Sequence, residues 1–409
     1  MFSYAIETNL QVSTRRGGRG PGGRGSGGTM PKRTALLVAM ATALALLLFT
    51  PDAQGGTYTV RQCHNSPPQN TDHEGEVVAN PPAGGPYAAY SDSTFCSSPL
   101  SGNAIGIAAE NLALEDESAA IRFTAPFGSH IAGVEVDAKL RSEQGHRARL
   151  SLRRVNGVEG YRIAVGASGP SDYATRSWAA PNQQSGFTSF EVALVCDDAP
   201  AQGCTVEGSG ANALASIRDL ALKIYDPLPP IVTMDGTLFE EEWVQGVGEI
   251  NSEALDFGGG LTHLEVTVNG VSVAGNGAET CQTIAGTEDA RILSPCAPSA
   301  TREAALDTFV PPFREGENVV RFCAKDFGTN PNQTCVDETV WVDNVPPTAA
   351  FRNEQPADDP ELIRAPVADA TSGIAPRSGL IEVRPVAGGA WKPLGTELVG
   401  GELRARVDS

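Results

Sequence analysis

Apolar residues recur at every second position in several short segments of this chain. That period is typical of a β-strand with one buried face and one wet face. Such alternation favours antiparallel sheets packed in pairs. We therefore predict an all-β protein whose first domain is a lectin-like or jelly-roll-like β-sandwich. The strand-like segments of this domain are 57–61, 120–124, 134–140, 146–152, 190–196 and 220–224.

A repeated strand ending divides the chain. Segments 221–230 and 338–347 each run from an alternating strand into an aspartate, two further residues and a pair of prolines. Proline offers no N–H to a sheet and holds the preceding residue in an extended conformation, so it ends a strand. We predict a β-sandwich domain at 57–227, a second domain at 228–345 and an incomplete third domain at 346–409.

Residues from about 229 to 409 resemble the bacterial Ig-like domains of secreted and cell-surface multidomain proteins. The segment has the same order of turns and strands as members of that family. One difference is that Thr329 separates Gly328 from Asn330, where the family has glycine followed directly by asparagine. The resemblance implies Ig-like β-sandwiches that act as spacer or adhesion units. The motifs that carry it are Asp256-Phe-Gly-Gly-Gly-Leu261, the strand ending at Asn269-Gly270, Gly316-Glu-Asn-Val-Val320, Asp326-Phe-Gly-Thr-Asn330, Asp343-Asn-Val-Pro-Pro347, and a second Asp369-Ala-Thr-Ser-Gly-Ile374.

The pattern of the N-terminal part indicates an export signal. Residues 1–29 form a basic, Gly/Arg-rich extension of low complexity, and 30–54 hold a short positive segment, an apolar run and a helix-breaking end. That order is typical of a secretory signal peptide. We expect a secreted or cell-surface protein whose signal segment engages the membrane during export only, with a retained N-terminal anchor as the alternative.

The eight cysteines support the same location, because they follow the signal and fall into close pairs. Eight cysteines allow 105 connectivities, so pairing between neighbours is a prediction and not a deduction. Loops of this size would each stabilise the fold by about 2.5 to 4 kcal/mol. There is no Cys-x-x-Cys motif for zinc or thiol–disulfide chemistry. The predicted disulfides join Cys63 to Cys96, Cys196 to Cys204, Cys281 to Cys296, and Cys323 to Cys335.

Charge excludes one class of partner. The formal net charge is −19, and a surface of that sign repels a phosphate backbone. We therefore expect no nucleic acid and instead an extracellular glycan or protein as the partner.

No catalytic motif stands out. The sequence lacks His-Glu-x-x-His, Gly-x-Ser-x-Gly and a phosphate-binding loop, and His64 beside Cys63 offers no thiolate if that cysteine is oxidised. Adjacent carboxylates usually form solvated surface, although they could serve glycoside hydrolysis or hold calcium through oxygen-rich loops. The runs in question are 115–117, 197–198, 240–242 and 358–359.

The aromatic residues also allow two interpretations, as core residues or as a binding surface. In a sandwich they are expected mainly in the core, with a flat platform for a sugar or peptide as the alternative. The residues concerned are Tyr87, Tyr90, Tyr161, Tyr173 and Trp178, and Trp243 and Trp341 are also expected in the core.

These observations favour a non-enzymatic protein with no catalytic residue, no cofactor and no metal ligand. Its modules would act in adhesion, in binding or as spacers. The alternative is a secreted carbohydrate-active enzyme, with the first domain catalytic and the Ig-like units accessory.

Overall fold

The computed structural model describes residues 6–11, 55–64, 73–80, 85–90, 96, 104–169, 172–181, 185–197, 203–206, 213–351 and 358–407. Nearly all regular structure in them is β-strand, and the sheets pair their strands antiparallel. The predicted all-β fold is therefore confirmed. The predicted signal segment, 30–54, lies outside the described residues. In the described part of the chain, no helix combines the length and the apolar character needed to cross a membrane.

The first sandwich packs two sheets against each other. One has the order β10-β7-β12-β5-β4, and the other has the order β3-β6-β11-β8-β9. The long strand β12 pairs with β5 along its first part and with β2 along Leu220 to Asp226. The strands are β2 (Gly56–Gln62), β3 (Glu76–Asn80), β4 (Tyr87–Tyr90), β5 (Ile105–Ala109), β6 (Ser118–Thr124), β7 (His130–Arg141), β8 (His146–Arg154), β9 (Glu159–Val165), β10 (Ala174–Ala179), β11 (Phe187–Cys196) and β12 (Leu214–Asp226).

The core of this sandwich follows the alternation seen in the sequence. Every second residue of β2 is buried, and Phe123 and Phe190 meet inside with ring centroids 6.2 Å apart. Strand β11 departs from the alternation because its outer face is covered too. There the carboxylate of Glu191, 1% exposed, pairs with the guanidinium groups of Arg122 and Arg153 from the neighbouring strands.

The second sandwich has the sheet orders β13-β14-β17 and β16-β15-β18-β19. Strict alternation in β14 and β18 places Ile250, Val320 and Phe322 in its core. Its strands are β13 (Ile231–Asp235), β14 (Val247–Leu255), β15 (Leu261–Val268), β16 (Val271–Ala278), β17 (Ser299–Asp307), β18 (Gly316–Asp326) and β19 (Gln333–Val342), with one 3₁₀ turn, η2 (Thr237–Phe239).

The C-terminal part forms two small sheets with the orders β1-β22-β23 and β20-β21-β25-β24. Strand β1 comes from the N-terminal extension, where we expected only low-complexity sequence, and it pairs antiparallel with β22. Backbone hydrogen bonds need no particular side chains, so composition did not reveal it. The strands are β1 (Ile6–Gln11), β20 (Thr348–Ala349), β21 (Leu362–Ala368), β22 (Leu380–Pro385), β23 (Lys392–Pro393), β24 (Thr396–Val399) and β25 (Glu402–Arg406).

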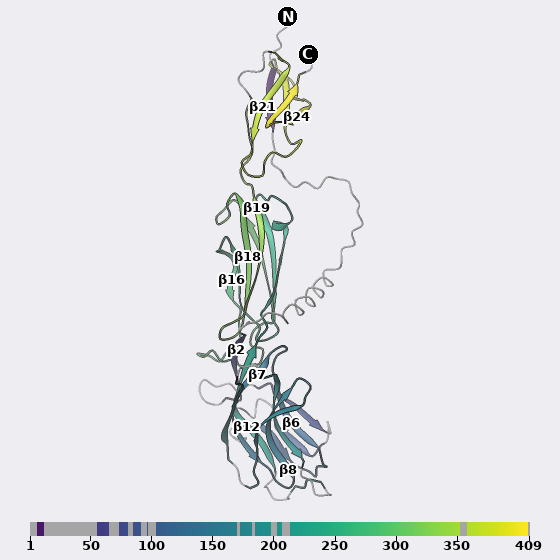
Figure 1. The fold of residues 1–409 in the computed structure, drawn as a ribbon, viewed down its shortest axis with the longest axis vertical. Helices are drawn as coiled ribbons and strands as arrows, with labels where there is room; N and C mark the ends of the chain where they lie inside the picture. The colour runs from purple at the N-terminus through teal and green to yellow at the C-terminus, as the bar shows by residue number, and fades with distance from the viewer. Residues whose placement is uncertain are drawn as a thin grey trace.

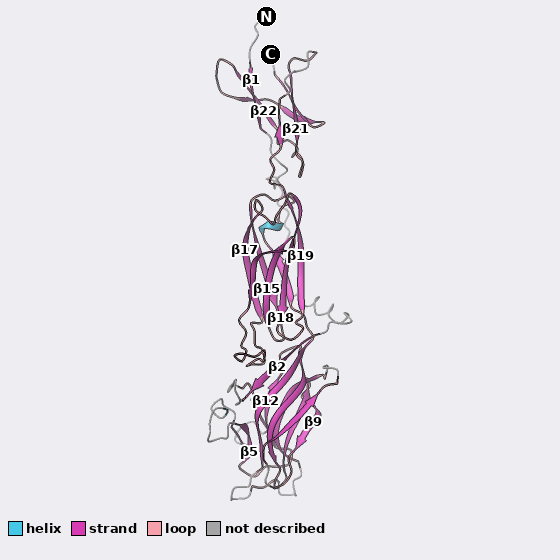
Figure 2. Cartoon of the chain, turned by 90° about the vertical axis from the view of Figure 1, so that its left-hand side faces the viewer, coloured by secondary structure: helices cyan, strands magenta, loops and turns pink. Residues whose placement is uncertain are grey.

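The molecule is elongated, with the three β units arranged one after another (Figure 1). A view turned by 90° shows the same line of units (Figure 2). All four predicted disulfides are present, Cys63–Cys96, Cys196–Cys204, Cys281–Cys296 and Cys323–Cys335. Four disulfides in one chain indicate an oxidising compartment.

Candidate metal centre

The first and second sandwiches meet along the edge of strand β2. Thr57 exchanges two backbone hydrogen bonds with Thr329, with N···O distances of 2.7 and 3.3 Å. Further along, the Ala290 N–H donates to the Thr59 carbonyl at 2.8 Å, and the Arg61 N–H donates to the Ala290 carbonyl at 3.0 Å. A strand edge is a row of unpaired donors and acceptors, and here two loops of the second sandwich satisfy it.

Side chains strengthen this junction. The Tyr58 hydroxyl donates to the Leu293 carbonyl at 2.8 Å, and the Tyr58 ring meets Phe327 edge to face with centroids 5.4 Å apart. Arg61 pairs with Asp289 at 2.5 Å. Ala290 and Leu293 pack with the core of the first sandwich although they belong to the second. The two units therefore share one packed interface.

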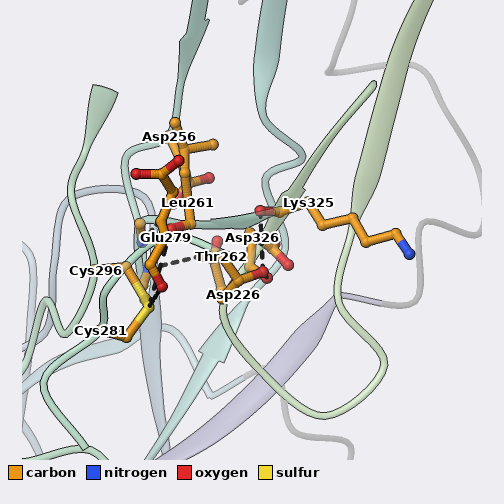
Figure 3. The surroundings of a disulfide bond; sticks show 11 residues. Asp226, Asp256, Leu261, Thr262, Glu279, Cys281, Cys296, Lys325 and Asp326 are labelled. Carbon is orange, nitrogen blue, oxygen red and sulfur yellow. Dashed lines mark hydrogen bonds between the residues drawn. A yellow bond between two sulfur atoms is a disulfide. The ribbon is translucent and has the colours of Figure 1, made fainter. Parts of the chain in front are cut away.

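Three aspartates from three segments converge at this junction. Asp226 ends β12 of the first sandwich, Asp256 begins the turn after β14, and Asp326 ends β18. One oxygen of each carboxyl group lies within 4.8 Å of the others. All three residues are buried, with exposed fractions of 0, 2 and 0%. Figure 3 shows the three side chains beside the Cys281–Cys296 disulfide.

The turn at 256–260 wraps its backbone around two of these carboxyl groups. Asp256 Oδ2 accepts from the N–H groups of Gly258 and Gly260, and Asp226 Oδ2 accepts from the N–H of Gly259. A Cβ atom at Gly258 would overlap the Asp226 carboxyl group, so the close approach requires glycine there. The run of three glycines seen in the sequence thus positions Asp226 and Asp256.

Asn332 fixes the third carboxyl group. Its side-chain Nδ2 donates to Asp326 Oδ2 at 2.6 Å and to the Asp226 carbonyl at 3.1 Å. Asp256 Oδ1 and Asp326 Oδ1 are buried and have no hydrogen-bond partner in the described part of the chain. Each of these two residues therefore has one oxygen held by protein donors and one left over.

Burial sets the electrostatics of the cluster. Loss of hydration, reinforced by the charge of Asp256, raises the pKa of Asp226 to about 6. Burial, with the charges of Asp226 and Asp256, raises the pKa of Asp326 to about 8, and burial also raises the pKa of Asp256. Within the described residues none of the three forms an ion pair with a basic side chain, and Lys325 extends away from them (Figure 3). The three groups can either retain protons or share a bound cation.

The donor set suits a hard cation, because all three ligands are carboxylate oxygens. Asp326 also lines a cleft of about 670 Å³ whose walls include Tyr58, Thr262 and Asp289. Asp326 is the one member of the cluster that lines this cleft. This arrangement is a candidate site for one divalent cation.

The second junction repeats part of this geometry. Asp369 Oδ1 accepts from the N–H groups of Thr371 and Gly373, as Asp256 does from its own turn. Asp343 accepts from the Val345 N–H and from the Ser372 hydroxyl, as Asp226 accepts from the backbone. In the described residues the acidic cluster of the first junction has no counterpart there with three carboxyl groups.

The acidic runs identified in the sequence do not contribute to this cluster. Glu117 accepts from the Leu114 N–H, Asp197 pairs with Arg147, and Asp359 pairs with Arg406. They are separate surface contacts, as expected for solvated carboxylates. Cys63 is in a disulfide, so it offers no thiolate beside His64.

The aromatic residues divide between core and surface. Tyr161 and Trp178 lie together on β9 and β10 with centroids 5.8 Å apart, and Tyr161 is 47% exposed. Trp243 and Trp341 were expected in the core, but Trp341 is 42% exposed and Trp243 is half-buried, and their ring centroids lie 5.5 Å apart with the planes inclined at 60°. The position of Trp341 in β19 points outward because Val340 and Val342 occupy the inner face.

The sequence alone predicts no metal ligand and does not link the three aspartates. Each already stood at a recognised turn or strand end: Asp226 before the paired prolines, Asp256 before the glycine run and Asp326 in the Asp-x-Gly loop. An aspartate at each of three recognised turns or strand ends was the available signal. Their convergence depends on how two sandwiches dock, which the local pattern does not contain.

No protein-family profile and no curated protein matches this chain. Similar solved structures include the glycoside hydrolase domain of Endo-D from Streptococcus pneumoniae, at 9% identity and a TM-score of 0.23, covering 65% of this chain and 37% of that one. Another is dimeric latent PorU from Porphyromonas gingivalis, at 9% identity and a TM-score of 0.19, covering 68% of this chain and 31% of that one. The chain thus spans well under half the length of either structure.

Proposed function

We propose that this chain is a secreted or cell-surface, non-enzymatic protein whose β-sandwich modules act as spacer, adhesion or binding units. The observation that carries the proposal is the junction at β2. Loops of the second sandwich complete the edge of the first through backbone hydrogen bonds at Thr57, Thr59 and Arg61. A junction of this kind holds two modules at a fixed angle, which a spacer needs.

The disulfides and the shape support the same function. Each of the first two sandwiches is cross-linked by two disulfides, which suit an oxidising extracellular location. The resemblance of about 229–409 to bacterial Ig-like domains adds the expectation of tandem modules on a cell surface. Units placed end to end separate a binding surface from its point of attachment.

The exposed ring of Tyr161, beside the half-buried Trp178, favours an extracellular glycan or a protein as the partner. Tyr161 is 47% exposed on β9, and its ring lies 5.8 Å from that of the half-buried Trp178 on β10, the edge strand of the other sheet. Exposed aromatic rings bind sugar rings and apolar side chains. Glu191, a buried carboxylate in the middle of this sandwich, is paired with two arginines. It is therefore unsuited to acid catalysis.

The test combines a glycan array with product analysis on the purified full chain. Binding to a glycan without release of smaller sugars supports a binding module, and Tyr161→Ala should weaken that binding. Cleavage of a bound glycan would refute the non-enzymatic function and favour the carbohydrate-active alternative. N-terminal sequencing of the exported protein tests its location.

A further inference from the structure

The carboxyl cluster at the junction is unusual because its charges have no protein counter-ion among the described residues. Asp226, Asp256 and Asp326 are at most 2% exposed, and one oxygen of each lies within 4.8 Å of the others. Three ionised carboxylates at that spacing repel one another strongly where water is excluded. Such a cluster needs protons or a cation to be stable.

The two unpartnered oxygens point to a ligand. Asp256 Oδ1 and Asp326 Oδ1 are buried without a hydrogen bond in the described chain, and a buried acceptor without a partner costs about 1 to 3 kcal/mol. The opposite oxygens of the same groups are held by Gly258, Gly260 and Asn332. Metal-binding carboxylates are commonly oriented by such hydrogen bonds to the oxygen that does not bind.

We propose that Asp226, Asp256 and Asp326 together bind one Ca²⁺ ion at the junction of the first two sandwiches. The ligands are oxygen only, which disfavours zinc and other metals that prefer nitrogen or sulfur. Three carboxylates from one protein site favour Ca²⁺ over Mg²⁺, which usually retains most of its waters and uses one or two carboxylates. Water from the cleft beside Asp326 completes the coordination.

The ion would act as a cross-link between modules. Asp226 belongs to the first sandwich, whereas Asp256 and Asp326 belong to the second, so a shared cation ties β12 to two loops across the interface. Gly259, which donates to Asp226, accepts a hydrogen bond from the Cys296 N–H. The site is thus continuous with the disulfide-closed loop that carries Ala290 onto β2. The ion site extends the proposed spacer function, and its role as a cross-link between modules rests on that function.

The first experiment is calorimetric titration of CaCl₂ into the chelator-treated full chain, with MgCl₂ as the second arm. We expect one Ca²⁺ per chain, and weaker binding of Mg²⁺. Asp256→Asn and Asp326→Asn should each weaken Ca²⁺ binding at least tenfold. Asp337→Asn is the control, because that carboxylate is exposed and pairs with Arg321 in the same sandwich, and it should bind within twofold of the unmodified chain.

A second measurement keeps the inference testable if a variant does not fold. The Tyr58 ring packs against Gly259, because a Cβ atom added to that glycine would lie 3.1 Å from the ring. Tyr58 is therefore beside the site and should sensitise Tb³⁺ luminescence in the unmodified chain. Ca²⁺ should abolish that luminescence, and Tyr58→Phe should remove the signal while calorimetry still finds one Ca²⁺ per chain, bound more weakly because the variant also loses the hydrogen bond to Leu293.

Absence of Ca²⁺ binding in the unmodified chain would overturn the inference. So would full affinity in both folded aspartate variants, or a Tb³⁺ signal that Tyr58→Phe leaves unchanged. Those results would leave the glycan and product assays of the proposed function untouched. Cleavage in those assays would refute the function without affecting the ion site.

Discussion

The hydroxyl group of Tyr58 offers the sharpest test of the junction. It donates to the Leu293 carbonyl of the other sandwich at 2.8 Å, and both residues are at least 92% buried. Tyr58→Phe removes about 1 kcal/mol of hydrogen bonding and leaves a buried carbonyl without that donor. We therefore expect a loss of about 1 to 2 kcal/mol in the free energy of unfolding.

Urea denaturation measures that loss, and hydrogen exchange locates it. The backbone amide of Ala290, which donates across the junction, should exchange faster in Tyr58→Phe. Tyr161→Phe is the matched control, because Tyr161 is 47% exposed on β9, and its effect should stay within about 0.5 kcal/mol. If Tyr58→Phe behaves like this control in both measurements, the reasoning about the junction is wrong.

Three further predictions concern the buried charges and the turn. Burial raises the pKa of Asp226 to about 6 and that of Asp326 to about 8, whereas an unfolded aspartate has a pKa of about 4. The protonated carboxyl groups therefore make their full contribution to the free energy of unfolding below about pH 4. In chelator it should fall as pH rises through 6 and 8; thermal unfolding that is flat or rises over pH 4 to 9 would contradict this. Gly258→Ala should displace the Asp226 carboxyl group and lower the melting temperature, whereas Gly277→Ala, with open space around it, should leave it nearly unchanged. Glu191→Ala should cost about 3 kcal/mol in urea denaturation, because it leaves two arginines without their shared partner, and a loss under about 1 kcal/mol would show that the triad adds little.

Strands with simple alternation could be predicted from the sequence. The segment predicted at 57–61 is β2, and that at 220–224 lies in β12, because one face of each meets a core. Strands β9 and β10 were not predicted, since both have mixed exposure without a regular inner face. Strand β1 could not be found in this way, because it joins its sheet through backbone pairing with a strand far along the chain.

The disulfides were predictable because each joins neighbours in sequence, whereas the metal centre was not. Its turn chemistry is visible in Asp256-Phe-Gly-Gly-Gly-Leu261, a motif that also carries the resemblance to Ig-like domains. The ligand from the other sandwich, Asp226, reaches that turn only because β2 docks on loops at Ala290 and Thr329. That docking depends on long-range packing, which periodicity along the chain does not specify.

Hydrogen bonds from β2 to the loops at Ala290 and Thr329 should hold the first two sandwiches as one rigid unit. A distance measurement by pulsed electron paramagnetic resonance tests it directly, using spin-labelled amino acids at Val165 on β9 and Val271 on β16, which are 44 and 53% exposed. With Ca²⁺ present, we expect a single narrow distance distribution. A broad distribution, as expected for two modules on a free hinge, would contradict it.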